Sequence, residues 1–302
     1  MSTSLQEDFN YANTIFNNNF SCSSHIYGNT NEELDDIFNS INISNKSVLA
    51  VMSSGDYLIM SHLFGAKSVE CFDINPLTYR YFFLRKWLIQ NGVLEYGKCG
   101  YERLIEIVNS VSNFSSEYER ESNTFWKEII ERFSEFSWDN NKLITADGYT
   151  FCSCFYDKKR EEIEKLVPSL NPVFYNASLS EESGLGTDKK YDYVFISNIL
   201  DWSNNRSPRR LEIIKRNLLN ILNSDGRVVC THFPSMYGGR NNSPVIIKLE
   251  RQVFDNDFDF QMFDDKGLVE GNIAYMYTRK NNFWGELIWV QAYKKILNMQ
   301  MK

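Results

Sequence analysis

The sequence predicts an α/β protein with a doubly wound, Rossmann-like sheet, and three observations lead to that prediction. Short apolar runs alternate with stretches of helical spacing through most of the 302 residues, a pattern typical of a sheet covered by helices. Residues 47–91 read as strand, helix, strand, helix, which forms a right-handed βαβ unit. Residues 95–165 show helical spacing without a strand signal. We therefore expect a helical insertion between the second and third strands.

The first strand and helix follow a polar, Asn/Ser-rich N-terminal stretch. A helix is expected from Glu32 to Ile41, with Asn31 as its cap. The apolar run 47–52 is bounded by polar residues and predicts a buried strand. A helix over 57–64 then ends at Gly65, because glycine commonly follows the last helical residue.

The remaining elements follow in chain order. The second strand is expected at 68–72 and its helix at 77–91, and the helices of the insertion at 101–111, 118–136 and 158–166. Strands resume at 173–176 and 191–197. A helix over 211–222, with Pro208 near its start, leads through a turn at Asp225 and Gly226 into a strand at 227–232. Two last strands are expected at 273–278 and 286–293.

Composition excludes several classes of function. The net charge is −7 and no long basic stripe is present, so neither nucleic-acid binding nor a stable dock on an anionic membrane is expected. No apolar stretch is long enough to span a membrane, although peripheral contact with one stays open. The six cysteines are too dispersed for a zinc site. The polar, acidic N-terminus is not a signal peptide, so we expect a cytoplasmic protein.

The turn after the first strand carries the clearest chemical signal. It reads Ser53-Ser54-Gly55-Asp56, and Asp73 follows Gly55 by 73 − 55 = 18 residues, at the end of the second strand. In doubly wound folds nucleotides bind at this turn, and an acidic residue about twenty positions further on holds the ribose hydroxyls. A carboxylate suits that role because it accepts two hydrogen bonds from a vicinal diol. Asp73 could instead cap the following helix.

The chemistry of the turn favours S-adenosylmethionine (SAM) over a dinucleotide. The turn has one glycine rather than three, and Asp56 would repel a pyrophosphate at the helix N-terminus. SAM has no phosphate and carries a positive sulfonium and ammonium, which acidic residues suit. A nicotinamide-dependent enzyme stays open as an alternative.

Two segments resemble a known family. Residues 48–56 with 72–76, and Ser197-Asn198-Ile199-Leu200-Asp201-Trp202 after a strand, are similar to the SAM site of betaine-lipid synthase-like proteins. Those are S-adenosylmethionine:diacylglycerol 3-amino-3-carboxypropyltransferases and their relatives. The resemblance covers roughly residues 45–235, including the helical insertion. This chain looks shorter than the lipid enzymes.

The resemblance implies roles for individual residues. Ser53 and Gly55 would border the methionine part of SAM, Asp73 would hold the ribose and Asn176 would lie near the adenine. Ser197 and Asn198 would face the sulfonium. The full set of predicted cofactor-binding residues is Met52, Ser53, Ser54, Gly55, Asp73, Ile74, Asn75, Asn176, Ala177, Ser197 and Asn198.

Catalytic groups are harder to predict, because transfer from a sulfonium often needs only alignment, with a base when the acceptor is protonated. The candidates are Asp201, His232 after its strand, and Tyr27 in an N-terminal lid. No metal ligand set is predicted. We expect residues 1–45 to form the lid and helical segment, and 46–302 the SAM-binding domain.

The sequence thus predicts a SAM-dependent transferase. The resemblance favours 3-amino-3-carboxypropyl transfer to a small-molecule or lipid acceptor. A methyltransferase and a non-catalytic SAM- or nucleoside-binding protein stay open, as does the oligomeric state.

Overall fold

A computed structural model describes residues 4–17, 26–27, 34–94, 99–133, 143–145, 159–201, 207–232, 250–262 and 273–279. Two compact units divide the chain, Met1–Thr187 and Asp188–Lys302. Each unit contains part of the predicted strand and helix pattern, and each is described below by itself.

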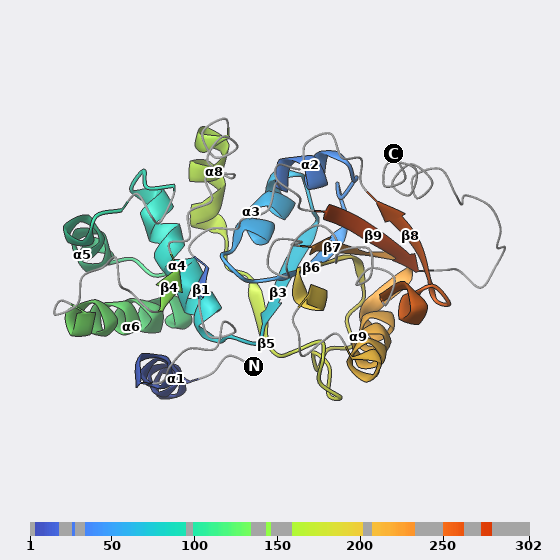
Figure 1. Cartoon of the computed structure of the whole chain (residues 1–302). Helices are drawn as coiled ribbons and strands as arrows, with labels where there is room; N and C mark the ends of the chain where they lie inside the picture. Colours follow the sequence, from blue (N-terminus) through green and yellow to red (C-terminus); the bar gives the residue numbers. More distant parts are fainter. Residues whose placement is uncertain are drawn as a thin grey trace, which may run out of the picture. The chain divides into compact units, whose positions relative to one another are not determined.

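The first unit is built on three parallel strands (Figure 1). They are β2 (Ser47–Val51), β3 (Ser68–Asp73) and β5 (Val173–Asn176), in the order β5-β3-β2. Helix α3 (Asp56–Leu63) connects β2 to β3, and α4 (Leu77–Gln90) follows β3. These bounds agree with the predicted βαβ unit to within a residue or two. The shorter helix α2 (Leu34–Asn39) precedes β2, while its predicted cap Asn31 lies outside the described residues.

The predicted helical insertion between the second and third strands of this sheet is confirmed. It contains α5 (Tyr101–Ser110), α6 (Glu117–Phe133) and α8 (Arg160–Leu166), which continues into the 3-10 turn η5 (Val167–Ser169). The insertion also holds a short strand that the sequence did not predict, β4 (Ile144–Thr145), which pairs in parallel with β1 (Ile26–Tyr27). Two residues are too few to show an alternating pattern, so no strand signal was visible.

A second unpredicted element is the N-terminal helix α1 (Leu5–Asn17), which lies within the polar stretch of the sequence. Among its described residues it buries the apolar side chains of Phe9, Ala12 and Ile15 and the charged side chain of Asp8. The Phe9 ring lies 5.0 Å from the ring of Phe125 on α6. A stripe this narrow is easily missed among polar neighbours, because most of the helix surface faces water.

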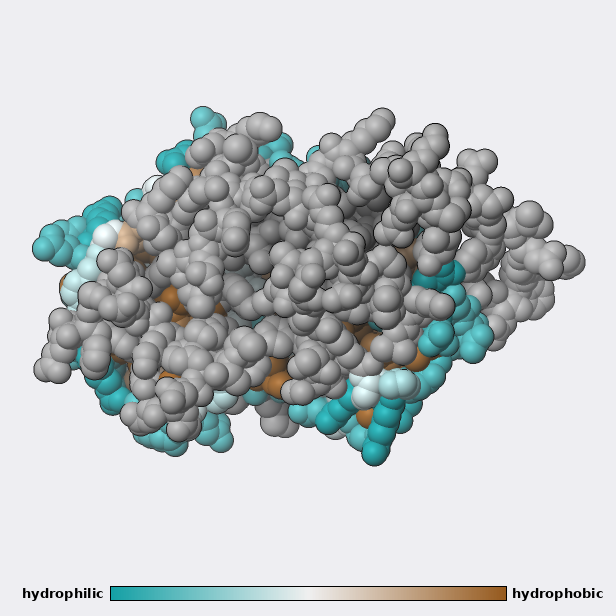
Figure 2. Space-filling model, viewed as in Figure 1, coloured by the Kyte–Doolittle hydropathy of each residue, from teal (hydrophilic) through white to brown (hydrophobic). Residues whose placement is uncertain are grey.

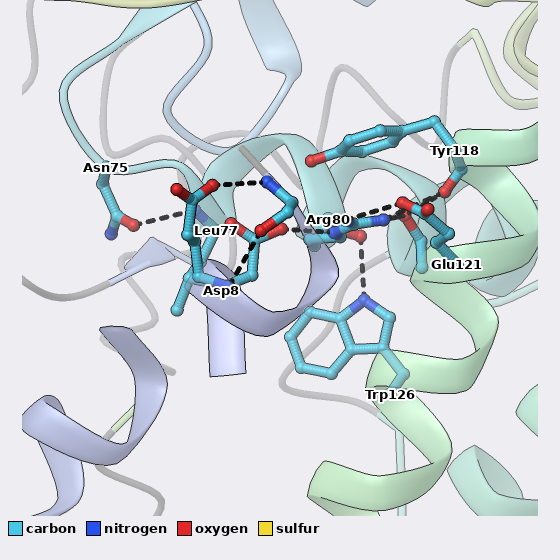
Figure 3. A network of polar contacts seen from close by, with 10 residues as sticks. Asp8, Asn75, Leu77, Arg80, Tyr118, Glu121 and Trp126 are labelled. Atoms are coloured by element: carbon cyan, nitrogen blue, oxygen red, sulfur yellow. Dashed lines mark hydrogen bonds and ion pairs between the residues drawn. The ribbon is translucent and has the colours of Figure 1, made fainter. Parts of the chain in front are cut away.

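Helix α4 is the buried centre of the first unit, since every side chain from Leu77 to Ile89 is buried. It nevertheless carries three cations, Arg80, Arg85 and Lys86, and buried charges require partners. Arg80 Nε lies 2.7 Å from Asp8 Oδ2 on α1, and Arg80 Nη2 lies 3.1 Å from Glu121 Oε2 on α6 (Figure 3). Lys86 pairs with Glu119 at 3.4 Å. Each cation is thus matched by an acid from another helix.

Backbone and ring contacts complete the surroundings of Arg80 (Figure 3). Its Nη1 donates to the Tyr118 carbonyl at 3.2 Å, and its guanidinium carbon lies 3.7 Å from the centroid of the Tyr118 ring. The Trp126 indole in turn donates to the Arg80 carbonyl at 2.8 Å. These contacts fix α1 and α6 to the first turns of α4.

Asp8→Asn is expected to lower the free energy of unfolding by about 3 kcal/mol, because it leaves a buried guanidinium with one half-buried acid. Urea denaturation at neutral pH measures the change. Glu106→Gln is the matched control, since it breaks an exposed pair with Arg103 and should cost little. Equal stability of the two variants would show that the Asp8–Arg80 pair contributes no more than a surface ion pair.

The second unit contains four strands in the order β6-β7-β9-β8. They are β6 (Tyr191–Ser197), β7 (Leu222–His232), β8 (Phe258–Met262) and β9 (Ile273–Arg279). Strands β6 and β7 are parallel and joined through α9 (Pro208–Ile221), whereas β9 runs antiparallel to both β7 and β8. The side chain of Ser207 caps α9 by accepting from the Arg210 amide. The strand predicted at 286–293 lies outside the described residues.

The turn predicted at Asp225 and Gly226 is wrong, because both residues lie inside β7. The pairing shifts there from Tyr191 with Leu222 to Tyr193 with Arg227, so β7 advances five residues (227 − 222) while β6 advances two (193 − 191). Gly226 suits this bulge, since a Cβ there would lie 2.8 Å from Leu222 Cδ2. The turn residues mark a β-bulge instead of a strand boundary.

Together the two units give the chain an α/β, Rossmann-like fold with seven strands of mixed direction, which confirms the predicted fold class. Among the described residues no helix is long and apolar enough to cross a membrane. On the face drawn in Figure 2 the coloured residues are mostly hydrophilic, with hydrophobic ones showing as small areas.

Candidate functional site

The turn after β2 adopts a backbone that ordinary residues avoid. Ser53 has φ of +43° and Gly55 has φ of +84°. A Cβ at Gly55 would also lie 3.1 Å from Phe82 Cδ2, so both conformation and space favour glycine there. A left-handed φ at a non-glycine residue such as Ser53 costs about 1 kcal/mol or more. Such strain is typical of functional turns, and here it occurs where the sequence predicts a ligand.

Asp73 ties this turn to the end of β3. Its carboxylate is almost fully buried, with Oδ2 accepting from Ser53 N at 2.9 Å and Oδ1 accepting from Asn75 N at 2.9 Å. Each oxygen thus accepts from one backbone amide, and the Thr78 side chain and the Ile74 amide also act on the carboxyl and lower its pKa. The residue that accepts from the first amide of α4 is Asn75, whose Oδ1 lies 3.0 Å from Leu77 N (Figure 3). Helix capping therefore does not account for Asp73.

The protonation of Asp73 is poised near neutral pH. Burial raises the pKa of its carboxyl to about 6, from an ordinary value of 3.8, and the amides of Asn75 and Ser53 oppose that rise. A raised pKa means that Asp73 stabilises the ligand-free fold most fully below about pH 3.8 and loses that contribution as pH rises through about 6.

Ligand affinity should follow the opposite trend, because hydroxyl donors need the ionised carboxylate. We expect affinity for an adenosine-containing ligand to fall as pH drops below about 6, approaching tenfold per pH unit. Isothermal titration calorimetry between pH 5 and 8 measures this, with Asp73→Asn as the control that should lose the step. A flat profile in the unaltered protein would contradict a role for the ionised carboxylate.

The end of β5 contacts the turn that follows β3. Asn176 is the register partner of Asp73 on the neighbouring strand. Its Nδ2 donates to the carbonyls of Asp73 and Ile74, each at 3.0 Å, and Ala177 N donates to the Asp73 carbonyl at 3.1 Å. The Ile74 side chain is 58% exposed, an unusual position for a large apolar group. It offers an exposed apolar surface at the residue that directly follows Asp73 in the chain.

Asp56 differs from what the sequence predicted. It is buried at the start of α3, with Oδ1 2.5 Å from Nη2 of Arg85 on α4. Its Oδ2 accepts from the Ser54 hydroxyl at 2.5 Å and from Arg85 Nη1 at 3.1 Å. Because Arg85 balances its charge, Asp56 is not the free anion that would repel a phosphate or attract a sulfonium, and that prediction is wrong.

Arg85 is the residue of this site that the sequence analysis missed. It also donates from Nη1 to the Ser54 carbonyl at 3.0 Å, and this hydrogen bond stabilises the turn after β2. The available signal was a cation in the middle of an apolar helix, which calls for a buried acid. The sequence does not indicate which acid.

The structure brings together most of the predicted cofactor-binding residues of the first unit. Ser53, Gly55, Asp73, Asn75, Asn176 and Ala177 meet through the hydrogen bonds and backbone turns given above. Met52, Ser54 and Asn75 are themselves buried, so they shape the turns after β2 and β3 from within.

In the second unit, the end of β6 shows its own strain. Ser197 has φ of +49°, and the pairing of β6 with β7 shifts between Phe195 and Ser197. Asn198 is half-buried, and a 3-10 turn, η6 (Ile199–Asp201), follows it. The strain lies at the motif that carried the family resemblance, and the roles predicted for Ser197 and Asn198 stay predictions.

The three predicted catalytic residues are described only by their backbones. Tyr27 lies in β1 opposite Thr145, Asp201 ends the turn η6, and His232 ends β7 opposite Ile273. Their side chains lie outside the described part of the chain. Within that described part, no group of three or more His, Cys, Asp or Glu residues could hold a metal ion.

Comparison with solved structures gives distant likenesses. A ribosomal protein L11 methylase from Lactobacillus delbrueckii subsp. bulgaricus is 17% identical, covering 82% of this chain and 76% of its own at a TM-score of 0.38. The N-methyltransferase NodS from Bradyrhizobium japonicum WM9, in complex with S-adenosyl-L-homocysteine, is 9% identical, covering 82% and 83% at a TM-score of 0.37. An rRNA methylase from Streptococcus thermophilus is 8% identical, covering 82% and 94% at 0.37.

No protein-family model matches the chain, and the comparison with curated proteins gives no match. The structural scores are too low to carry more than a general likeness. The fold assignment therefore depends on the strand order of this chain, and the function on its site.

Proposed function

We propose that this chain is a cytoplasmic SAM-dependent transferase that acts on a small-molecule or lipid acceptor. One observation carries the proposal: the buried Asp73 carboxylate, whose two oxygens are each oriented by one backbone amide at 2.9 Å. A carboxylate fixed in this way would present two adjacent acceptor oxygens, which the vicinal hydroxyls of a ribose require.

The neighbouring residues suit the rest of a nucleoside. The exposed Ile74 side chain offers apolar contact to a flat base. Gly55 is buried against the Phe82 ring, and its left-handed φ sets the path of the turn after β2. The turn lacks the glycine-rich loop that a pyrophosphate needs. These features support a ligand with a ribose and no phosphate.

SAM would supply a carbon made reactive by the attached sulfonium. The acceptor's lone pair forms a bond to that carbon, the carbon–sulfur bond breaks, and its electron pair neutralises the sulfur. Attack on the methyl carbon yields S-adenosylhomocysteine, whereas attack on the methionine γ-carbon transfers 3-amino-3-carboxypropyl and yields methylthioadenosine. The resemblance of the two sequence segments favours the second reaction. The protein contributes alignment, and a base where the acceptor carries a proton.

The nucleoside by-product tests the proposal. Purified protein is incubated with SAM and a metabolite-plus-lipid extract of the source cells, and the nucleosides are identified by mass spectrometry beside an Asp73→Asn control. Methylthioadenosine above the control supports aminocarboxypropyl transfer. S-adenosylhomocysteine would instead make this a methyltransferase. SAM binding without turnover for any acceptor would indicate a non-catalytic binding protein.

A further inference from the structure

The inference concerns Asn176, and it rests on the proposed nucleoside site. Both hydrogen bonds of its side chain go to backbone carbonyls, those of Asp73 and Ile74 at 3.0 Å each. A carbonyl only accepts, so the group that faces them must be the amide NH₂, whose two hydrogens are then both in use. The side chain keeps only its carbonyl oxygen for any other partner.

The peptide between Ile74 and Asn75 links this side chain to the ribose-binding carboxylate. Its carbonyl oxygen, on Ile74, accepts from Asn176 Nδ2, and its N–H, on Asn75, donates to Asp73 Oδ1 at 2.9 Å. A peptide unit is planar and rigid, so fixing its oxygen also fixes the direction of its N–H. The orientation of the carboxylate therefore depends on the position of Asn176.

A second connection acts on the other side of Asp73. The Asp73 carbonyl accepts from both Asn176 Nδ2 and Ala177 N, at 3.0 and 3.1 Å. Asp73 and Asn176 are register partners on β3 and β5, so these bonds extend the pairing of the two strands beyond its last residues. Asn176 thus donates hydrogen bonds to the peptide groups on both sides of Ile74.

From this geometry we infer that Asn176 is a positioning residue, which orients the Asp73 carboxylate for the ribose and does not select the base. Its influence on binding passes through the Ile74–Asn75 peptide. Substitutions should therefore weaken every nucleoside with the same ribose by the same factor, whatever base it carries.

The test compares two ligands that differ in the base. Dissociation constants for S-adenosylhomocysteine and S-inosylhomocysteine are measured by calorimetry for the unaltered protein, Asn176→Asp and Asn176→Ala. Asn176→Asp keeps the carbonyl oxygen but places a second oxygen against the two backbone carbonyls. Asn176→Ala removes the donors without adding a charge. Both variants should weaken both ligands about tenfold, because an Asp73 carboxylate that is no longer oriented would lose about one hydrogen bond to the ribose.

Asn91→Asp is the matched control, because Asn91 Nδ2 donates to the Trp87 carbonyl at 2.9 Å at the far end of α4. It should leave both dissociation constants unchanged. A further readout is the pH dependence of binding. The Asn75 amide lowers the pKa of Asp73, so the midpoint should move upward in Asn176→Ala if that amide is no longer held.

The outcomes separate the inference from the function on which it rests. A changed ratio of the two dissociation constants in either Asn176 variant would show that Asn176 reads the base. Unchanged or tighter binding of S-adenosylhomocysteine to Asn176→Asp would also overturn the inference. If Asp73→Asn loses binding while both Asn176 variants keep it, the proposed function stands and only the inference fails. If the unaltered protein binds neither ligand, the proposed function fails, and the inference with it.

Discussion

Asp73→Asn is expected to weaken binding of S-adenosylhomocysteine about 100-fold or more. The variant removes the charge that, in the proposed site, would accept the two ribose hydroxyls. Hydrogen bonds to a charged group contribute roughly 1.5–3 kcal/mol each, where about 1.4 kcal/mol corresponds to tenfold. The new amide also places an NH₂ group against either Ser53 N or Asn75 N, both of which donate to Asp73 in the unaltered protein. The substitution thereby removes the negative charge of residue 73 and also disturbs its two hydrogen bonds to backbone amides.

Calorimetry at pH 7.5 measures the effect, and a thermal melt checks that the variant is folded. Glu70→Gln provides the matched control. Glu70 lies on the same strand, and its carboxylate accepts from the Tyr175 hydroxyl at 2.6 Å, away from the turn after β2. It should bind the ligand as the unaltered protein does. Unchanged affinity in a folded Asp73→Asn protein would remove the observation on which the proposed function depends.

Arg85→Met is expected to lower the free energy of unfolding by about 3–5 kcal/mol, because it leaves a buried carboxylate without its cation. Asp56 is 1% exposed in the folded chain, so water cannot replace the guanidinium. The Ser54 carbonyl loses its donor at the same time. Arg85 is itself buried. Its loss also removes a hydrogen bond that stabilises the turn containing Ser53 and Gly55.

Urea denaturation measures this loss, and a double variant identifies its cause. Asp56→Asn combined with Arg85→Met removes both charges, so it should recover much of the lost stability. Arg103→Met is the control for the loss of an arginine, since Arg103 forms an exposed pair with Glu106. If the double variant is as unstable as Arg85→Met, the unpaired charge on Asp56 is not the cause of the lost stability. The cause is then the lost packing of the aliphatic part of the arginine side chain.

The sequence predicted the site in the first unit well where the signal was local. The turn after β2, the acid at the end of β3 and the helices that follow are read from residues that lie close together in the chain. The spacing of 73 − 55 = 18 residues singled out Asp73, and its role toward a ribose stays a prediction. Local patterns suffice there because a βα turn and the next strand end are brought together by the fold class itself.

The same method failed where a partner lies far away in the sequence. Asp56 was read as a free anion, but its partner Arg85 lies 29 residues further on. The side chain of Asn176 donates to backbone groups 103 and 102 residues earlier, which no local pattern indicates, and its role near the adenine stays a prediction. In the described part of the chain, three strands and one helix were not predicted: β1 and β4 have two residues each, α1 buries a narrow stripe, and β8 lies outside every predicted element.

By itself the sequence determined the fold class, the order of the elements and the position of the acid that would bind a ribose. These features can be predicted from the spacing of hydrophobic residues and from the turn residues, because that spacing reflects which side of each helix or strand is buried. Only the tertiary structure decided which charges are neutralised, which amides orient Asp73 and how Asn176 acts on it. Those properties depend on pairs of distant residues that packing brings within hydrogen-bond distance, and no local spacing records such pairs.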